Sequence, residues 1–399
     1  MHNLTKIRWF RIASRITYFP ALLFIYPFAL RKKKNKTGLF FFFDRYSIGG
    51  AQRIHLDILE SVEDVSKQVY FTRKSVNQSL KEAFFSVPNT VSKDIHFWCD
   101  NILFRLFAVH YYAFYLKRHK HATVLSSNST FFYDLLPFLN ERITTIELLH
   151  NFTFGKKGME FFGLANHQYL THRFVYDTYT LNNIRNQYKA YNISDPYLDR
   201  IVFLEPGVDV PATITKDYSY PLKVLYAGRG GQQKRIYLLN RVVEHCLHEK
   251  LSIEFHFAGT VIDELSAGIK KKSTLYGNIG SADKMKELYQ QSHAILMTSA
   301  YEGFPMLIKE SMAYGCVPIV TALEGNKMHL QDHFNALLID AVEDEEKVVS
   351  EGIEKIRELV TNQELLKRLS NDAHAYAMKY FDKRKFLREC REFLLTKPT

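Results

Sequence analysis

The sequence predicts an α/β protein made of two doubly wound domains, each with a parallel sheet between layers of helices. Its 399 residues are enough for two domains at about 100–200 residues each. Short apolar runs of strand length alternate with longer stretches of helical spacing, as is typical of parallel sheets. The alternation occurs in two series, separated by a linker near 210–221 that contains Pro211 and Pro221. We expect the carboxyl ends of the strands in both sheets to face a cleft between the domains.

The first series begins with a run of four phenylalanines that ends at Asp44 and indicates a buried strand. Helices are expected where apolar side chains recur at helical spacing, at 52–62, 101–117 and 178–190. Further strands are expected at 69–71, 122–125, 144–149 and 201–204.

The second series begins after the linker. Strands are expected at 222–227, 253–258, 274–276, 294–297, 317–320 and 336–339. Helices are expected at 235–249, 283–291, 305–314, 342–360 and 363–379, and a last amphipathic helix at 383–395.

The composition is that of a globular protein, with 46% hydrophobic and 24% charged residues. It excludes collagen-like, low-complexity and largely disordered chains. The four cysteines are far apart in the sequence and show no zinc spacing, so we expect buried free thiols in a reducing compartment: Cys99, Cys246, Cys316 and Cys390.

The positive charge is concentrated in an N-terminal extension, residues 1–37. The net charge of the chain is +11. The extension has no acid and nine basic residues, namely Lys6, Arg8, Arg11, Arg15, Arg31, Lys32, Lys33, Lys34 and Lys36. The rest of the chain is therefore nearly neutral, which argues against a nucleic-acid-binding protein with a basic stripe on its folded body.

An apolar stretch, 16–30, lies inside this extension. It is short for a spanning helix and is interrupted by Pro20 and Pro27. A signal peptide would end in small residues, whereas four basic residues follow here. A peripheral anchor on an anionic membrane surface fits best, and a helix packed on the protein's own body is the alternative.

The segment 299–315 carries the richest combination of functional groups. Pro305 suits the start of a helix, whose backbone N–H groups form an anion site. Glu302 precedes that helix start and Glu310 lies inside the helix. Carboxylates beside an anion site are explained by a ligand that also carries hydroxyls, because a carboxylate accepts strong hydrogen bonds from a sugar diol. A nucleoside diphosphate sugar has both parts.

Two glycine-containing turns follow predicted strands. In the turn at 228–234, Gly228 allows a tight bend while Arg229 and Lys234 offer cations to phosphate. Gly49 and Gly50 would let the backbone approach a ligand closely.

Together these motifs resemble the retaining glycosyltransferases of family 4, which have the GT-B fold. Glu302 and Glu310 form the Glu-x7-Glu pair of the string EGFPMLIKESMAYGCVPIV. The other similar segments follow in the family's order: the glycine loop at Gly49 and Gly50, His150-Asn151, Glu205-Pro-Gly207-Val-Asp209, Gly228-Arg229 with Lys234, and Asn335-Ala-Leu-Leu.

The resemblance implies a role for each matching residue. Glu310 would hold the ribose hydroxyls, Glu302 the donor-sugar hydroxyls, and Arg229 with Lys234 the diphosphate. His150 would contact the donor sugar near the transfer point. The remaining expected substrate-binding positions are Gly49, Gly50, Gly228, Gly303, Phe304, Pro305, Met306 and Leu307.

It also implies a domain organisation: an acceptor domain at 38–215, a donor-nucleotide domain at 216–380, and a helix at 383–395 that packs back on the first domain. The expected reaction is metal-independent and needs no cofactor. It proceeds with retention by same-face attack, in which the leaving phosphate accepts the acceptor's proton.

Three positions depart from the family pattern: Gln52, Arg235 and Met328. The expected donor is a UDP-sugar, with a GDP-sugar as the alternative, and the expected acceptor is a glycan or lipid-linked glycan. A bacterial surface-polysaccharide enzyme attached peripherally to the cytoplasmic membrane face would explain both the motifs and the extension. The alternative function is an inactive sugar-nucleotide-binding or scaffold subunit of the same fold.

Overall fold

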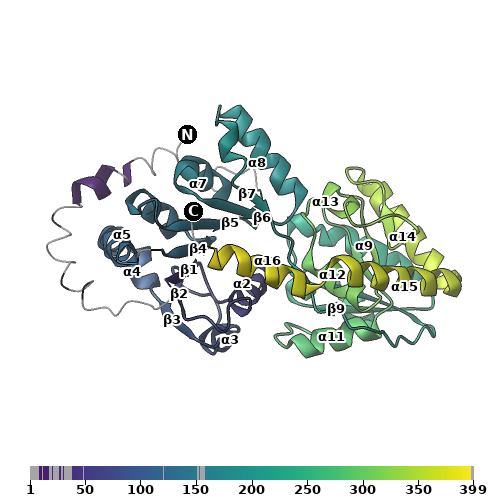
Figure 1. The fold of residues 1–399 in the computed structure, drawn as a ribbon. Helices are drawn as coiled ribbons and strands as arrows, with labels where there is room; N and C mark the ends of the chain where they lie inside the picture. Colours follow the sequence, from purple (N-terminus) through teal and green to yellow (C-terminus); the bar gives the residue numbers. More distant parts are fainter. Residues whose placement is uncertain are drawn as a thin grey trace. The chain divides into compact units, whose positions relative to one another are not determined.

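The computed structural model describes residues 9–10, 12–17, 20, 27, 30, 38–47, 49–119, 121–150, 152 and 158–396. The chain divides into two compact units (Figure 1). The first unit comprises Met1–Glu205 with Phe386–Thr399, and the second comprises Pro206–Lys385. The division falls before the boundary predicted near residue 215, because Val208 pairs with Asp382 and Lys309 donates to the carbonyl of Pro206.

Within the described residues of the first unit, seven parallel strands form one sheet in the order β3-β2-β1-β4-β5-β6-β7. The strands are β1 (Leu39–Phe43), β2 (Lys67–Phe71), β3 (Thr90–Asp94), β4 (Thr123–Ser127), β5 (Thr144–Leu148), β6 (His172–Val175) and β7 (Ile201–Phe203). The helices are α2 (Gly50–Glu60), α3 (Lys81–Phe85), α4 (His96–Asp100), α5 (Ile102–Lys117), α6 (Thr130–Leu135), α7 (Met159–Asn166) and α8 (Thr178–Ala190).

The phenylalanine run of β1 lies at the centre of this sheet and explains why it forms. All five residues of β1 are buried, as expected for a strand with helices on both faces. Alternate side chains point to opposite faces. Phe42 packs with Tyr112 of α5 and Phe131 of α6, whereas Phe43 stacks on His55 of α2.

In the described part of the second unit, six parallel strands form a sheet in the order β10-β9-β8-β11-β12-β13. The strands are β8 (Leu222–Ala227), β9 (Ile253–Ala258), β10 (Thr274–Leu275), β11 (Ala294–Met297), β12 (Val317–Thr321) and β13 (Leu337–Ile339). The helices are α9 (Ile236–His248), α10 (Ala267–Lys272), α11 (Ala282–Gln291), α12 (Met306–Ala313), α13 (Glu324–Lys327), α14 (Glu345–Thr361) and α15 (Gln363–Tyr380).

Each face of the second sheet has its own apolar core. Leu222, Val224 and Tyr226 of β8 pack with α9 and α14, whereas Leu225 between them packs with α12 and α15. Both units are therefore doubly wound α/β domains, as the sequence predicts.

The final helix, α16 (Lys383–Leu395), lies almost entirely in the first unit. Its Phe393 packs edge-on against Phe174 of β6, and its Arg391 pairs with Asp64. All four cysteines lie in the described part of the chain, where each is buried and free, as expected.

Two strands were missed by the sequence analysis, β3 and β6. β3 is an edge strand of sequence TVSKD, partly exposed and without an apolar run. β6 is four residues long and carries Arg173, which is buried because Glu147 of the neighbouring strand β5 pairs with it. An arginine inside a strand gives no sign of burial until its partner is known.

The N-terminal extension is described only in part. Phe10 packs against the core formed by α5 and α6, and Ser14 is buried. No described helix is long and apolar enough to cross a membrane. Most of the apolar stretch 16–30, and the basic run 31–36, lie outside the described residues.

Candidate functional site

Each sheet has one place where its strand order reverses. In the first unit this switch point lies between β1 and β4, and in the second between β8 and β11. The loops after the two central strands diverge there, so doubly wound sheets bind ligands at the carboxyl ends of these strands. The predicted site residues lie in these loops or next to them.

At the switch point of the second unit, Lys234 forms an ion pair with Glu302. Lys234 ends a short 3-10 turn after β8, and Glu302 lies in the loop between β11 and α12. The side chains are only 14% and 12% exposed. The two loops are also joined through Gln233, whose carbonyl accepts from the N–H of Ala300 at 2.8 Å and whose amide donates to the carbonyl of Tyr301 at 2.9 Å. The structure thus joins two of the four predicted catalytic residues.

Arg229 lies on the same turn but points elsewhere. Its side chain is exposed and donates to Gln233 Oε1 at 3.1 Å. Gly228 begins the turn, and its carbonyl lies 2.2 Å from the position that a Cβ on Gly259 would occupy. The turn therefore packs closely on the end of β9 and leaves the guanidinium of Arg229 accessible to an anion.

The helix that follows Glu302 begins one residue later than predicted. Pro305 has an extended backbone, with ψ of 136°, and is the N-cap residue of α12 rather than part of its first turn. Glu310 lies in the second turn of α12, where it accepts a hydrogen bond of 2.6 Å from the hydroxyl of Tyr289.

Gly325 on α13 fixes the loop that carries Glu302. A Cβ at this position would lie 1.7 Å from the carbonyl oxygen of Gly303 and 3.0 Å from that of Glu302. Only glycine allows α13 to approach the Glu302–Gly303 peptide so closely. Among the backbone positions predicted to bind substrate, Gly303 to Leu307, the first is therefore packed directly against a neighbouring helix.

Arg235, one of the departures from the family pattern, has a defined structural role. Its φ of 47° lies in the left-handed region, where glycine is usual. The buried guanidinium donates to three carbonyls: Thr298 at 2.7 Å, Ser299 at 3.0 Å and Val342 at 2.6 Å. These bonds offset the backbone strain and tie the loop after β8 to the segments that follow β11 and β13.

This arrangement predicts how substitutions at Arg235 differ. We expect Arg235→Ala to lower the free energy of unfolding by about 3–5 kcal/mol, because it keeps the left-handed backbone and leaves buried carbonyls without donors. Arg235→Gly loses the same bonds but relieves the strain, so it should be less damaging by about 1 kcal/mol. Urea denaturation of both variants measures the difference, and equal stabilities would contradict the strain argument.

In the first unit, His150 follows β5 and belongs to a buried polar cluster. Its Nε2 lies 2.7 Å from the hydroxyl of Ser127, which ends β4, and 3.0 Å from Nε2 of His55. His55 lies on α2, the helix that begins at Gly50 with Gly49 as its N-cap. A Cβ on Gly50 would meet nothing within 4 Å, so there is open space beside its backbone.

Both histidines are neutral at neutral pH. Burial lowers the pKa of His150 to about 3. Burial, and then the nearby His150, hold the pKa of His55 well below its ordinary value. Two neutral imidazoles in contact can form one N–H···N bond, and the donor nitrogen depends on the tautomers. The arrangement fixes the orientation of His150 without giving it a charge.

Sequence reasoning missed four residues that hold the predicted ones: His55, Ser127, Tyr289 and Gln233. His55 had a usable signal, because it lies one and a half turns after Gly50 on the predicted helix. Nothing in one sequence links Ser127 to His150 or Tyr289 to Glu310, since their contacts depend on strand order and helix packing.

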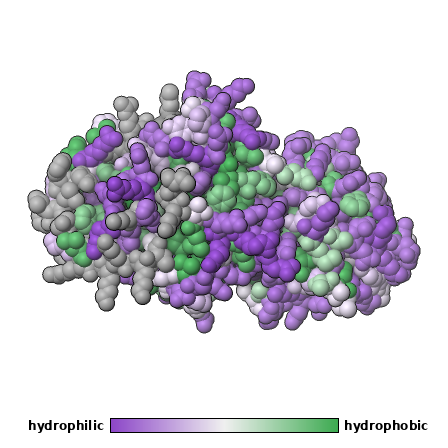
Figure 2. Space-filling model, in the orientation of Figure 1, coloured by the Kyte–Doolittle hydropathy of each residue, from purple (hydrophilic) through white to green (hydrophobic). Residues whose placement is uncertain are grey.

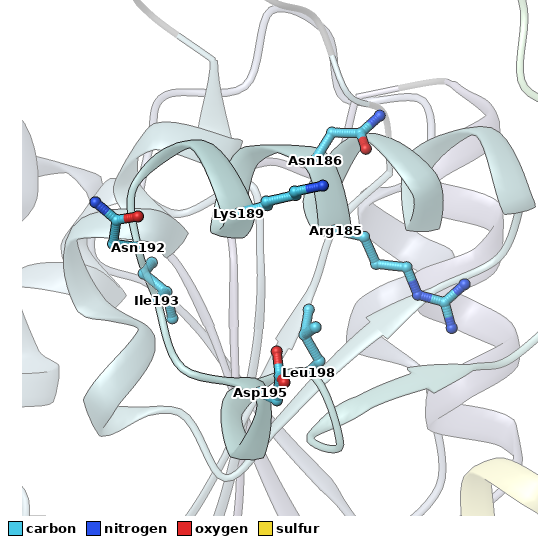
Figure 3. Close-up of a pocket in the computed structure, with 7 residues that line it drawn as sticks. All are labelled: Arg185, Asn186, Lys189, Asn192, Ile193, Asp195 and Leu198. Atoms are coloured by element: carbon cyan, nitrogen blue, oxygen red, sulfur yellow. The ribbon is translucent and has the colours of Figure 1, made fainter.

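A cavity of about 540 Å³ in the first unit contains none of the predicted residues (Figure 3). It lies between α8 and the following turn and is lined by Arg185, Asn186, Lys189, Asn192, Ile193, Asp195 and Leu198. None of these side chains is fully buried.

Comparison with known proteins agrees with this geometry. Residues 215–376 match the family model described as "Glycosyl transferases group 1". No curated protein shows a significant match to the sequence.

Solved structures share the whole fold at low identity. HepE of Anabaena, in a complex with UDP and glucose, has a TM-score of 0.72 at 14% identity, over 90% of this chain and 99% of that one. A glycosyltransferase of Rickettsia africae has a TM-score of 0.67 at 14% identity, over 91% and 100%. The lipopolysaccharide outer core galactosyltransferase WaaB has 0.63 at 17%, over 89% and 99%. Residues 215–376 of the second unit thus match a group 1 glycosyl transferase domain, and the chain has the two-domain fold of GT-B glycosyltransferase structures.

Proposed function

We propose that this protein is a retaining glycosyltransferase that moves a sugar from a UDP-sugar to a lipid-linked glycan. The observation that carries the proposal is the Lys234–Glu302 pair at the switch point of the second unit. A cation for the diphosphate and a carboxylate for the sugar lie side by side there. A GDP-sugar is the alternative donor.

In this proposal the second unit contacts three parts of the donor, namely the ribose, the diphosphate and the transferred sugar. Glu310, oriented by Tyr289, accepts hydrogen bonds from the ribose hydroxyls. Lys234 and Arg229 neutralise the diphosphate, and the start of α12 adds the positive end of its dipole. Glu302 accepts from hydroxyls of the transferred sugar. The roles of Gly49, Gly50 and His150 remain those implied by the resemblance to family 4.

The proposed reaction is attack on the same face from which the nucleotide leaves. The bond between the anomeric carbon and the β-phosphate oxygen breaks, and the bond to the acceptor hydroxyl oxygen forms. The departing phosphate takes the acceptor's proton. Negative charge grows on that phosphate in the transition state, and Lys234 and Arg229 stabilise it without a metal ion.

The choice of donor and pathway is supported by the named neighbours. HepE has been crystallised with UDP-glucose, and a mutant of S. aureus TarM with Fondaparinux, α-GlcNAc-glycerol and UDP. WaaB is named for the lipopolysaccharide outer core. We therefore favour bacterial surface-polysaccharide synthesis, with the enzyme attached peripherally to the cytoplasmic membrane face through its basic extension, residues 1–37.

A thermal-shift screen with UDP, GDP and ADP tests the donor site. We expect UDP to raise the melting temperature, because a ligand that binds only the folded state stabilises it. Glu310→Ala should abolish most of that rise by removing the ribose contact. Glu287→Ala, which removes an exposed carboxylate on α11, is the matched control and should keep the rise.

Stereochemistry tests the reaction itself. Proton NMR of the product from an α-linked UDP-sugar should show an α-glycosidic bond, and a β-bond would overturn the retaining mechanism. Nucleotide binding without any transfer or donor hydrolysis would favour the inactive sugar-nucleotide-binding subunit instead.

A further inference from the structure

An exposed apolar surface covers the start of α5 and the short helix α4 before it. We call it the α4–α5 patch. It consists of Phe97 (60% exposed), Trp98 (50%), Ile102 (67%), Leu103 (66%), Phe104 (38%) and Phe107 (46%). Single exposed apolar residues are ordinary, but a cluster of this size marks an interaction surface.

The patch is ordered and continuous. The rings of Phe97, Trp98 and Phe104 contact one another with centroid distances of 5.4–5.6 Å. Asn101 caps α5 by accepting from the N–H of Leu103 at 3.0 Å. Later turns of the same helix are buried, at Val109 for example. A rigid, anchored helix therefore presents these side chains to its surroundings.

A second apolar segment runs beside α5. The Phe10 ring lies 5.8 Å from the guanidinium carbon of Arg105, and the Thr17 hydroxyl lies 3.4 Å from Nε2 of His110. Three apolar side chains of the same segment are exposed, namely Trp9 (67%), Ile12 (42%) and Ile16 (71%). Figure 2 shows hydrophobic side chains at the surface of this end of the first unit.

The positive charge of the N-terminal extension, residues 1–37, indicates which partner covers the α4–α5 patch and the apolar side chains beside it. Trp9 and Ile12 belong to the extension that holds nine basic residues and no acid. A second copy of this chain would bring the same positive charge against itself, whereas an anionic membrane would attract it. Tryptophan also prefers the boundary between lipid tails and headgroups, and both tryptophans of the chain are exposed in these two segments. Three acids lie around the buried Cys99 of α4: Asp134, which pairs with Arg105, Asp94, which pairs with His96, and the exposed Asp100.

We propose that the α4–α5 patch, with Trp9, Ile12 and Ile16, is a docking surface that enters the interface of an anionic lipid bilayer. The folded body thus contacts lipid directly, in addition to the basic extension. The inference deepens the proposed function and rests on it for the membrane-borne acceptor.

Tryptophan fluorescence of the full chain tests this surface. In a Trp9→Phe variant, Trp98 is the sole tryptophan. We expect its emission to shift to the blue on phosphatidylcholine–phosphatidylglycerol vesicles, and bromine-labelled acyl chains to quench it. Pure phosphatidylcholine vesicles should give a weaker response. If the protein cosediments with the anionic vesicles while Trp98 emission stays unchanged, the extension binds alone and the proposal is wrong.

Substitutions in the patch give an independent measure. Phe97→Ser with Leu103→Ser should lower the partition onto anionic vesicles about tenfold, because two large apolar groups no longer leave water. The control Val76→Ser changes a 79% exposed residue of the same unit outside the patch and should partition normally. Equal partition of all three proteins overturns the proposal.

Two further measurements distinguish a failure of the lipid-docking proposal from a failure of the proposed donor site and from self-association of the protein. Calorimetric binding of UDP to each variant reports the donor site, so a failure of the proposed function is seen separately. Sedimentation velocity without lipid reports self-association, and a dimer that the two serines abolish would mean that a second copy covers the patch, contrary to the proposal.

Discussion

Lys234→Ala is expected to lower the rate of sugar transfer by about 10²–10³-fold, the usual cost of removing one group that stabilises charge in a transition state. The substitution removes the cation that should face the leaving diphosphate. It also leaves Glu302, whose side chain is 12% exposed, without its ion-pair partner. Steady-state transfer from a UDP-sugar measures the loss.

Binding of UDP and of uridine shows whether Lys234 acts through the diphosphate. The variant should bind UDP more weakly but bind uridine as the wild type does, because uridine carries no phosphate. Lys223→Ala is the matched control, since Lys223 lies on the same strand, β8, at the end opposite to the switch point. Unchanged UDP affinity together with an unchanged rate would remove Lys234 from the donor site.

The ion pair also means that Lys234 has a partner before any donor is present. A diphosphate must therefore share Lys234 with Glu302 or displace it. Glu302→Gln keeps the size of the side chain and removes its charge, so we expect it to strengthen binding of UDP while it slows transfer. The two effects should differ in direction, because the carboxylate competes for the cation yet accepts hydrogen bonds from the sugar.

The fold follows from local sequence to a large extent, and the second unit more so than the first. In the second unit, strands such as β8, β9 and β11 are short, mostly apolar segments, and their observed bounds match the predicted ranges. In the first unit β6 was missed, because Arg173 is buried only through its pairing with Glu147. Such burial depends on which strands are neighbours, and that is decided by the tertiary structure.

For the candidate site too, some features were predictable from the sequence, whereas others depend on the tertiary structure. Motif and spacing predicted Lys234, Glu302 and Glu310 as candidate residues, and their roles toward a nucleotide-sugar stay predictions. The supporting contacts were not predicted. Arg235 tolerates a left-handed backbone only because three carbonyls from distant segments accept its guanidinium. The sequence shows only that the usual glycine is absent.

The His55–His150 cluster predicts a marked loss of stability in acid. A histidine that is buried and neutral has a folded pKa below its unfolded pKa of about 6.5. The unfolded chain therefore binds protons first, and stability falls as pH falls. For His150 the fall should begin near pH 6.5 and end near its folded pKa of about 3, at up to about 1.4 kcal/mol per pH unit. The lowered pKa of His55 adds to it in the same direction.

Denaturant unfolding at a series of pH values measures this loss. The wild type should lose about 2 kcal/mol between pH 6.5 and pH 5 from His150 alone. In His150→Asn, which keeps a polar side chain beside Ser127, the pH dependence should be smaller even if the variant is less stable throughout. His245→Asn is the control, because His245 is exposed on α9 and pairs with Glu249. An identical slope in wild type and His150→Asn would mean that His150 stays neutral in both states or is not buried.

The lowered pKa of His150 also has a consequence for the pH dependence of catalysis. Because His150 is neutral throughout the physiological range, its protonation cannot produce a step in the pH–rate profile between pH 5 and pH 8. Ser127→Ala removes one of its hydrogen-bond partners without changing any charge. We expect that variant to lower kcat more than it raises KM, with the pH profile unchanged, because the imidazole loses its fixed orientation and not its proton. A new step near pH 6.5 in the variant would instead show that Ser127 helps to keep His150 neutral.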